Sequence, residues 1–361
     1  MSSQTPHTIS LPALILPDVH QKCARVEEII ASHGSDCASV VFLGDYLDSR
    51  ESSDPTDLHL ALRWLAQSVR DPRRVHLLGN HDVAYFFPAE ETYCSGWSED
   101  RQRVFDEAIS TQNMNAVRER LGLAVQAGPW VLSHAGFPAH FCRDATPAQL
   151  IQWAEAARAV LTSSVGRDNM HPLLGCGVVR RGRSRVGGLT WLDWDHEFTP
   201  IPGVHQIVGH TSDRLARGRH LRGSGSLLAG TAYEAKMQSL HRDEFRSVNW
   251  CLDTGLQSWA IAYPDRLEIH TAKSVTIWPA PVALNGARTY PELKEHELYP
   301  VAGERPPLFV PWEEIDRALT SPEMRDEFQA RMEHHRSDER GPSPEAVASA
   351  LRHLQRRRGR A

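Results

Sequence analysis

Five short apolar stretches of this chain each end at polar residues of the kinds that bind divalent metal ions. The polar groups that follow the apolar stretches are Asp18-Val19-His20, Gly44-Asp45-Tyr46-Leu47-Asp48, Gly79-Asn80-His81-Asp82, Ser133-His134-Ala135-Gly136 and Gly209-His210-Thr211. Carboxylates, an amide oxygen and imidazoles make a mixed oxygen and nitrogen donor set, which suits Mn, Fe or Zn better than Ca or Mg. The order and content of the five groups predict a dinuclear metal site.

Two divalent ions roughly 3.5 to 4 Å apart can bind a phosphate, generate hydroxide at neutral pH and offset charge in an in-line displacement. Such a site needs a shared carboxylate, and Asp45 is the candidate because Gly44 before it allows a tight turn off the strand. Asp18 and His20, two apart on an extended segment, face the same way and can hold the first ion. The candidate ligands for the second ion are Asn80, His134 and His210.

The elements that must position these residues are strands followed by helices. Short apolar runs bounded by Gly and Pro are typical of buried strands, and ligands collect beyond the carboxyl ends of strands in open α/β sheets. Helical patterns over 21–32 and 57–70 separate the first three runs. Asp18, Asp45 and Asn80 follow one another at the roughly 30-residue spacing of strand–helix–strand units.

The middle and later parts of the chain predict two further features. Residues 84–128 are expected to form an aromatic-bearing, largely helical insertion that overhangs the site, with a helix over 100–121. Farther along, 249–255 leads into alternating apolar runs at 258–263 and 267–271, which predict a hairpin. We place a second sheet in this later half.

Composition limits the class of protein. A chain of 361 residues with 41% hydrophobic and 24% charged residues can bury a large core. A formal net charge of −5 gives no support for a nucleic-acid partner. The six cysteines show no Cys-x-x-Cys pair or zinc-finger spacing, which favours a reduced, cytoplasmic protein. Neither a secretory signal nor a membrane span is predicted, and the oligomeric state is left open.

Taken in order, the five motifs resemble those of the calcineurin-like metallophosphoesterase superfamily over residues 14–270. The resemblance implies an α/β fold, a four-layer αββα sandwich of two mixed sheets flanked by helices, with the site at the strand C-terminal edge. It also implies a water or hydroxide that bridges two metal ions as nucleophile, and we expect manganese, with iron, zinc or nickel as alternatives. Carried over by position, the implied ligands are Asp18, His20 and Asp45 for one ion and Asp45, Asn80, His134 and His210 for the other.

The same resemblance assigns roles to three further residues. His81 is expected to be the general acid that protonates the leaving oxygen, with Asp82 holding its imidazole in the charged state. A neighbouring carboxylate favours the protonated imidazole, which fits this chemistry. Asp48 is expected to support the bridging carboxylate from outside the ligand set.

Departures from the superfamily pattern point to one of its branches. Many diesterase members carry Gly-His-x-His, but Ser212 stands in place of the second histidine here. This difference favours the phosphoprotein phosphatases and the bacterial diadenosine tetraphosphate hydrolases, and a tryptophan-containing loop at 190–194 resembles theirs. We expect Trp191 and Trp194 to pack in the core and residues 253–255 to form a structural turn.

The arginine that binds phosphate in those two classes of enzyme stands at a different position in this chain. They place Arg directly after Gly-Asp-x-x-Asp, whereas here Ser49 follows and Arg50 comes one position late. A Gly-rich loop between His134 and His210 offers further guanidinium groups, which suit phosphate. Its arginines are Arg180, Arg181, Arg183 and Arg185. We name Arg50, Arg181 and Arg183 as candidate phosphate-binding residues and do not choose among them.

We divide the chain into a metallophosphoesterase domain over 1–284 and a C-terminal appendage over 285–361, Pro-rich at first and then helical and polar. The arginine-rich run at 352–360 is interpreted as a solvated helix end. Nothing in the appendage repeats the metal-binding motifs.

Three functions are compatible with these features. The favoured one is a metal-dependent phosphatase acting on phosphoprotein or on a small phosphate ester. The alternative is a hydrolase of dinucleoside polyphosphates such as diadenosine tetraphosphate, for which aromatic side chains of the insertion could stack a base. Those side chains are Tyr85, Phe86, Phe87, Tyr93 and Trp97. A non-catalytic scaffold is disfavoured because no ligand is missing.

Overall fold

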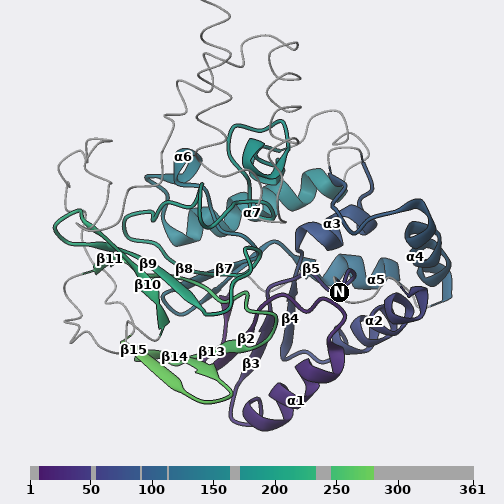
Figure 1. Ribbon diagram of the computed structural model, residues 1–361, viewed down its shortest axis with the longest axis horizontal. Helices are drawn as coiled ribbons and strands as arrows, with labels where there is room; N and C mark the ends of the chain where they lie inside the picture. The colour runs from purple at the N-terminus through teal and green to yellow at the C-terminus, as the bar shows by residue number, and fades with distance from the viewer. Residues whose placement is uncertain are drawn as a thin grey trace, which may run out of the picture.

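The computed structural model describes residues 8–49, 54–89, 92–111, 114–162, 171–232 and 245–279. Two β-sheets pack face to face in this part of the chain, and helices cover their outer faces (Figure 1). The predicted α/β sandwich of two mixed sheets is therefore confirmed. The predicted appendage at 285–361 and Arg50 lie outside the described residues.

The first sheet carries the first three motifs. Its strand order in the described part of the chain is β15-β14-β13-β2-β3-β4-β5. The parallel strands are β2 (Ala13–Leu16), β3 (Ser39–Phe42), β4 (Arg74–Leu77) and β5 (Leu121–Gly122). Helix α1 (Cys23–His33) connects β2 to β3, and α2 (Pro55–Ser68) connects β3 to β4. The predicted strand–helix–strand units are thus present.

The second sheet carries the last two motifs. Within the described ranges its order is β1-β6-β7-β8-β12-β9-β10, with β11 beside β9. These strands are β1 (Thr8–Ile9), β6 (Ala124–Ala127), β7 (Trp130–Ser133), β8 (His205–Val208), β9 (Arg217–Arg222), β10 (Leu227–Thr231), β11 (Phe245–Ser247) and β12 (Asn249–Cys251). Because β7 and β8 are parallel neighbours, the residues that follow them end up side by side.

The predicted hairpin forms, but it belongs to the other sheet. Strands β13 (Ser258–Ala262) and β14 (Arg266–Thr271) pair antiparallel, and β15 (Val275–Pro279) follows. β13 also pairs with β2, with Ala260 opposite Ile15, so the hairpin extends the first sheet. Our placement of the hairpin in a second sheet was wrong, because a local pattern does not specify which distant strand it pairs with.

Alternate residues of the central strands build the layers. Ile15, Val41 and Leu77 face the second sheet and pack with Trp130 and Ile207. Their neighbours in the strands pack on the outer side with apolar residues of α1 and α2. Side chains alternate between the two faces of a strand, so strands covered on both faces are apolar throughout. Helix α7 (Pro147–Thr162) packs against β6 on the second sheet.

The segment 84–128 is mainly helical but less regular than predicted. It contains the end of α3 (Asn80–Phe86), then α4 (Glu99–Thr111) and α5 (Met114–Arg120), and closes with β5 and β6. The single helix expected over 100–121 is therefore two helices, and both pack against α2 (Figure 1). In the described part of the chain, every helix is too short or too polar to cross a membrane.

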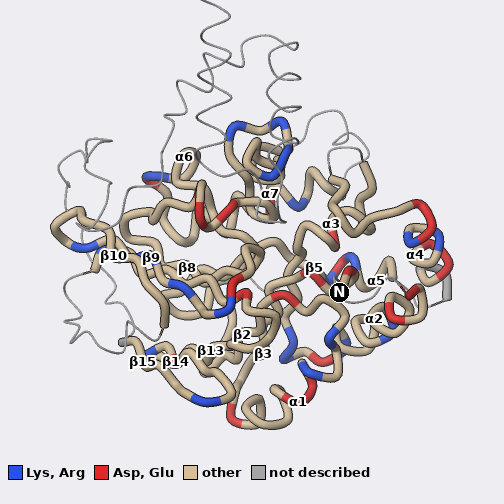
Figure 2. Tube along the Cα trace, in the orientation of Figure 1, with Lys and Arg blue, Asp and Glu red and all other residues tan. Residues whose placement is uncertain are grey.

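Short elements complete the arrangement above the second sheet. They are α6 (Ala139–Cys142), η2 (Pro172–Leu174) and η3 (Val178–Arg180). The arginine-rich loop that includes η3 lies near α7, where Figure 2 shows several basic positions close together.

Candidate metal centre

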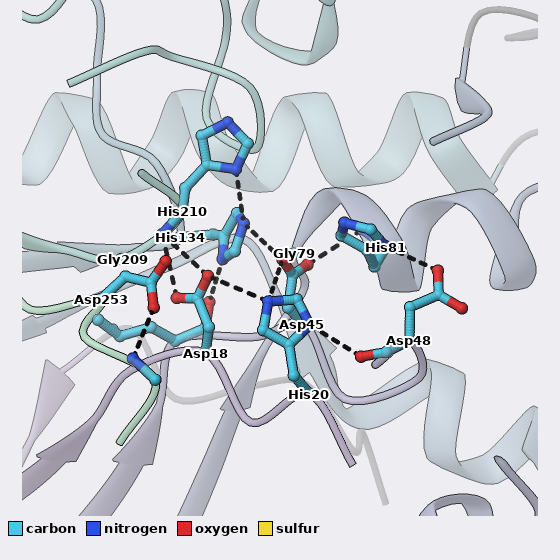
Figure 3. Close-up of polar contacts among 12 residues, drawn as sticks. Asp18, His20, Asp45, Asp48, Gly79, His81, His134, Gly209, His210 and Asp253 are labelled. Carbon is cyan, nitrogen blue, oxygen red and sulfur yellow. Dashed lines mark hydrogen bonds and ion pairs between the residues drawn. The ribbon is translucent and has the colours of Figure 1, made fainter. Parts of the chain in front are cut away.

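All five motifs meet at the carboxyl ends of parallel strands, as Figure 3 shows. β2, β3 and β4 of the first sheet lead to Asp18, Asp45 and Asn80, while β7 and β8 of the second lead to His134 and His210. These side chains are buried, the most exposed being His210 at 8%. Residues separated by up to 192 positions in the chain are therefore gathered into one polar cluster inside an apolar fold.

Unusual backbone conformations hold the ligands close together. Asp45 and His210 have positive φ angles of 56° and 70°, which residues other than glycine seldom adopt. Gly44, with φ of 119°, lies so close to the next loop that a Cβ would sit 2.4 Å from the Gly79 nitrogen. Such conformations are characteristic of functional sites, where the surrounding packing maintains them.

One group of donors consists of Asp18, His20 and Asp45. His20 Nε2 lies 3.9 Å from Asp18 Oδ2 and 3.8 Å from Asp45 Oδ2. His20 Nδ1 lies 2.8 Å from the Asp48 carbonyl oxygen and must be the donor there, because a carbonyl oxygen only accepts. In the neutral ring, Nε2 then presents its lone pair to the two carboxylates.

A second group surrounds His134. His134 Nδ1 donates to the Leu43 carbonyl oxygen at 3.0 Å, so Nε2 of the neutral ring again carries a lone pair. That atom lies 3.4 Å from Asp45 Oδ2, 3.1 Å from Asn80 Oδ1 and 3.2 Å from His210 Nδ1. Asp45 Oδ2 is thus common to both groups, which is the arrangement expected of a bridging carboxylate.

The donor chemistry of both groups fits divalent metal ions. Within each group the facing ligand atoms all lie within 4.8 Å of one another. Several of these atoms are lone-pair acceptors that face each other in a buried site, and a cation would relieve their mutual repulsion. The residues therefore fit two metal ions, as the sequence motifs implied.

The pKa directions agree with this interpretation. Burial, followed by the nearby Asp253 and Asp45 carboxylates, raises the pKa of Asp18 well above its usual range. Burial likewise lowers the pKa of His134 and places that of His210 well below the ordinary histidine value. Imidazoles that resist protonation keep their lone pairs at neutral pH, which metal binding requires.

His81 lies beside the first group and is paired with Asp48. The His81 and His20 ring centroids are 5.4 Å apart, and His81 Nδ1 lies 2.7 Å from Asp48 Oδ2. Burial alone would lower the pKa of His81, but Cys94, Asp45 and the hydrogen bond to Asp48 raise it well above its usual range. A protonated imidazole at this place can donate a proton to a neighbouring group.

The structure corrects the role expected of Asp82. Its carboxylate accepts hydrogen bonds from the backbone N–H groups of Asp45, Tyr46 and Gly79, at 2.7, 2.8 and 2.9 Å. Asp82 is the third residue of α3, from which a carboxylate folds back onto the helix start. Asp82 therefore connects two loops that carry proposed ligands. We had expected Asp82 beside the His81 imidazole, but the residue there is Asp48.

Two residues that we did not assign to the site hold Asp48 in place. The Tyr85 hydroxyl donates to Asp48 Oδ1 at 2.8 Å, and Arg101 Nη2 lies 3.2 Å from the same oxygen. Arg101 Nη2 also donates to the Leu47 carbonyl oxygen at 3.0 Å. Both come from the 84–128 segment, and no local spacing signals their contact with Asp48.

The aromatic residues of that segment are not equally available. Tyr85 and Phe86 are buried, with exposures of 1% and 5%, so they are not placed to stack a base as we had suggested. Tyr93 is 41% exposed and stacks on Trp97 with ring centroids 3.8 Å apart. The predicted core packing of Trp191 and Trp194 is confirmed, because both side chains are buried.

Among the loop arginines, Arg180 is the one with a described contact to Thr211, the residue that follows His210. Its Nη2 donates to Thr211 Oγ1 at 3.1 Å, and its Nε pairs with Asp193 Oδ2 at 2.8 Å. Arg181 is partly buried and Arg183 is exposed in the same loop. The positive charge of Arg180 also contributes to the low pKa of His210, after burial.

Comparison with known families finds a model that matches the first part of the described residues. A family model described as calcineurin-like phosphoesterase matches residues 11–174, which include four of the five motifs. The predicted resemblance to the calcineurin-like phosphoesterases is confirmed by this match, which supports a phosphoester hydrolase. Divalent metal ions are the usual cofactors of that family. No curated protein matches the sequence.

Several solved structures match this chain at low sequence identity and with TM-scores below 0.5. A cold-active protein-tyrosine phosphatase of a psychrophilic Shewanella species is 16% identical over 76% of this chain and 83% of that chain, with a TM-score of 0.47. A protein serine/threonine phosphatase from Saccharomyces cerevisiae is 12% identical over 80% and 87%, with a TM-score of 0.36. A metallophosphoesterase from Sphaerobacter thermophilus is 16% identical over 75% and 88%, with a TM-score of 0.34.

Proposed function

We propose that this protein hydrolyses phosphate monoesters, on a phosphoprotein or a small molecule, with two divalent ions, preferably manganese. The ligands would be Asp18, His20 and Asp45 for one ion and Asp45, Asn80, His134 and His210 for the other. When bound, such a pair of ions binds the phosphate, lowers the pKa of water and offsets the charge that develops in the displacement. The chain's own residues then have to position the ions and supply a proton to the leaving group.

The observation that carries this proposal is the pairing of His81 with Asp48 beside the first donor group. The Asp48 carboxylate fixes the ring through Nδ1 and favours the imidazolium, so Nε2–H is available to the oxygen that leaves phosphorus. An alkoxide or phenoxide is a poor leaving group and gains most from such a proton. A nucleotide phosphate leaves as a stable anion and gains less, so the pair favours ester over anhydride hydrolysis.

Arg180 is our candidate for the phosphate contact, in place of Arg181 and Arg183. Its guanidinium bonds to Thr211, the neighbour of a proposed ligand, and Asp193 fixes it by an ion pair. A planar guanidinium held in this way can bind two phosphate oxygens at once.

One observation favours dinucleoside polyphosphate hydrolysis as a second candidate. Tyr93 and Trp97, whose rings stack, lie on either side of Cys94 in the sequence; Cys94 contacts His81, and Tyr93 is substantially exposed. An exposed aromatic stack of this kind could receive a nucleobase, with an energy of about 1–3 kcal/mol per stacked base.

The chain's organisation and compartment are part of the proposal. We assign residues 1–284 to one phosphoesterase domain and 285–361 to an appendage. All six cysteines are free, which supports a reducing, cytoplasmic location.

The test compares kcat/KM for an aryl phosphate monoester with that for diadenosine tetraphosphate, using protein reconstituted with Mn²⁺. We expect a ratio well above one, because His81 is placed to assist a poor leaving group. A ratio well below one would replace the phosphatase by the dinucleotide hydrolase. The variant Tyr93→Ala is the matched control, since it should weaken only the dinucleotide reaction and only if the aromatic stack binds a base.

A further inference from the structure

A third cluster of metal-binding side chains lies outside the two donor groups. His81 Nδ1, Asp48 Oδ2 and Cys94 Sγ face one another, with separations of 2.7 Å between nitrogen and oxygen, 3.2 Å between nitrogen and sulfur and 3.4 Å between oxygen and sulfur. The three residues come from different segments, namely the loop after β3, the first turn of α3 and the loop before α4. The proposed phosphatase reaction uses the first two residues and gives no role to the cysteine.

We propose that Asp48, His81 and Cys94 form an inhibitory site for a thiophilic divalent ion, of which Zn²⁺ is the type. A zinc ion with its usual bonds of about 2.0–2.3 Å to oxygen, nitrogen and sulfur holds neighbouring ligand atoms roughly 3.3–3.6 Å apart. The distance of 3.4 Å between oxygen and sulfur lies within that range, and the distance of 3.2 Å between nitrogen and sulfur is slightly shorter. The nitrogen and oxygen atoms, 2.7 Å apart, would need to separate most, which the loss of their mutual hydrogen bond allows.

The cluster is held in place from both sides. Asp48 is fixed through its other oxygen, Oδ1, by Tyr85 and Arg101, which leaves Oδ2 facing the site. Cys94 begins a turn closed by a hydrogen bond from Trp97 N to the Cys94 carbonyl oxygen at 3.1 Å. The stack of Trp97 on Tyr93, with an interplanar angle of 12°, stiffens this turn. Preorganised ligands lose less conformational freedom when they bind an ion.

Ligand softness separates this site from the two donor groups. Thiolate sulfur selects zinc and other soft ions, whereas Mn²⁺ prefers oxygen-rich and imidazole ligands. Neither of the two donor groups contains a cysteine. Dependence on Cys94 therefore distinguishes an ion at the third site from one that replaces manganese at the first two.

Occupation of this site would inhibit the enzyme through His81, and this step rests on the proposed function. The incoming ion displaces the thiol proton of Cys94 and the Nδ1 proton of His81, and both protons pass to solvent. The ion then occupies the lone pair on Nδ1, so the ring no longer becomes imidazolium. His81 would keep one N–H but lose the acidic proton that a poor leaving group needs.

The experiment uses the manganese-loaded enzyme, Cys94→Ser and the control Cys23→Ser. Cys23 is also partly buried, but it lies in the first turn of α1 and outside the cluster. Co²⁺ is added first, because a thiolate bound to Co²⁺ gives a near-ultraviolet charge-transfer band that does not depend on activity. Half-inhibition by Zn²⁺ is then measured for each protein relative to its own uninhibited rate.

We expect the band in the wild type and in Cys23→Ser but not in Cys94→Ser. We also expect Cys94→Ser to need at least about 10-fold more Zn²⁺ for half-inhibition, since even loss of a ligand's outer partner costs about 10- to 100-fold in metal affinity. Equal bands in the wild type and Cys94→Ser would overturn the site. A Cys94-dependent band without inhibition would support the site and overturn the role of His81 as acid, so the two failures are distinguishable.

Discussion

His81 Nδ1 donates a hydrogen bond of 2.7 Å to Asp48, a residue 33 positions earlier in the chain. The carboxylate that follows His81 directly in sequence points instead to backbone N–H groups. Proton donation and loop positioning are therefore divided between two aspartates. This division gives the two residues separable phenotypes on substitution.

The first prediction concerns His81 itself. His81→Asn keeps a polar side chain but has no acidic proton to transfer, so kcat should fall by ~10²- to 10⁴-fold while both metal ions remain bound. The loss should be large for phenyl phosphate and small for an aryl phosphate whose leaving group is a stable anion. Elemental analysis provides the control for metal content. Full activity on phenyl phosphate would show that His81 is not the acid.

Asp48→Asn and Asp82→Asn should have different effects. Asp48→Asn removes the charge that supports the imidazolium, so the loss of activity should follow the leaving group as it does for His81→Asn, while both metal ions remain bound. Asp82→Asn turns an N–H group toward backbone donors that the carboxylate accepted, which should cost about 1–3 kcal/mol of stability and reduce metal occupancy. Urea unfolding and metal analysis of both variants measure this. Identical profiles for the two variants would contradict the assigned roles.

Metal content tests the shared carboxylate. Asp45→Asn should reduce occupancy of both ions, because its Oδ2 faces His20 and His134 alike. Asp18→Asn is the matched comparison and should weaken only one ion. Competition with a chelator, followed by elemental analysis of the protein, measures both. Two tightly bound ions per chain in Asp45→Asn would rule it out as the bridge.

The buried side chain of Glu197 is expected to make the free energy of unfolding depend on pH. Burial raises its pKa to about 8, while its Oε2 accepts hydrogen bonds from the backbone N–H groups of Gly187 and Asp193. An acid with a raised pKa in the folded state stabilises the fold fully below its unfolded pKa, near 4.3. That stabilisation is lost as the pH rises toward about 8.

Glu197→Gln tests this effect, because an amide can accept the same hydrogen bonds without titrating. Relative to Glu197→Gln, the wild type should lose roughly 1.4 kcal/mol of unfolding free energy per pH unit as the pH rises through this window. Urea unfolding of both proteins at several pH values measures the difference. A difference that does not change with pH would show that Glu197 is ionised in the folded protein.

The sequence by itself determined the central strands and the residues that follow them. A parallel strand buried on both faces must be apolar throughout, so polar residues at its end stand out in the sequence. Asp18, Asp45 and His134 were recognisable for this reason, and the parallel arrangement brought them together. The class of enzyme followed from these motifs and is confirmed by the family match.

Tertiary structure alone decided which groups contact these residues. Asp82 was expected beside His81 because it is adjacent in sequence, but its place at the third position of α3 turns it toward the helix start. Arg101 and Cys94 contact Asp48 from 53 and 46 positions farther along the sequence. Such contacts depend on how loops pack, and packing is a property of the whole fold that no local pattern of residues contains.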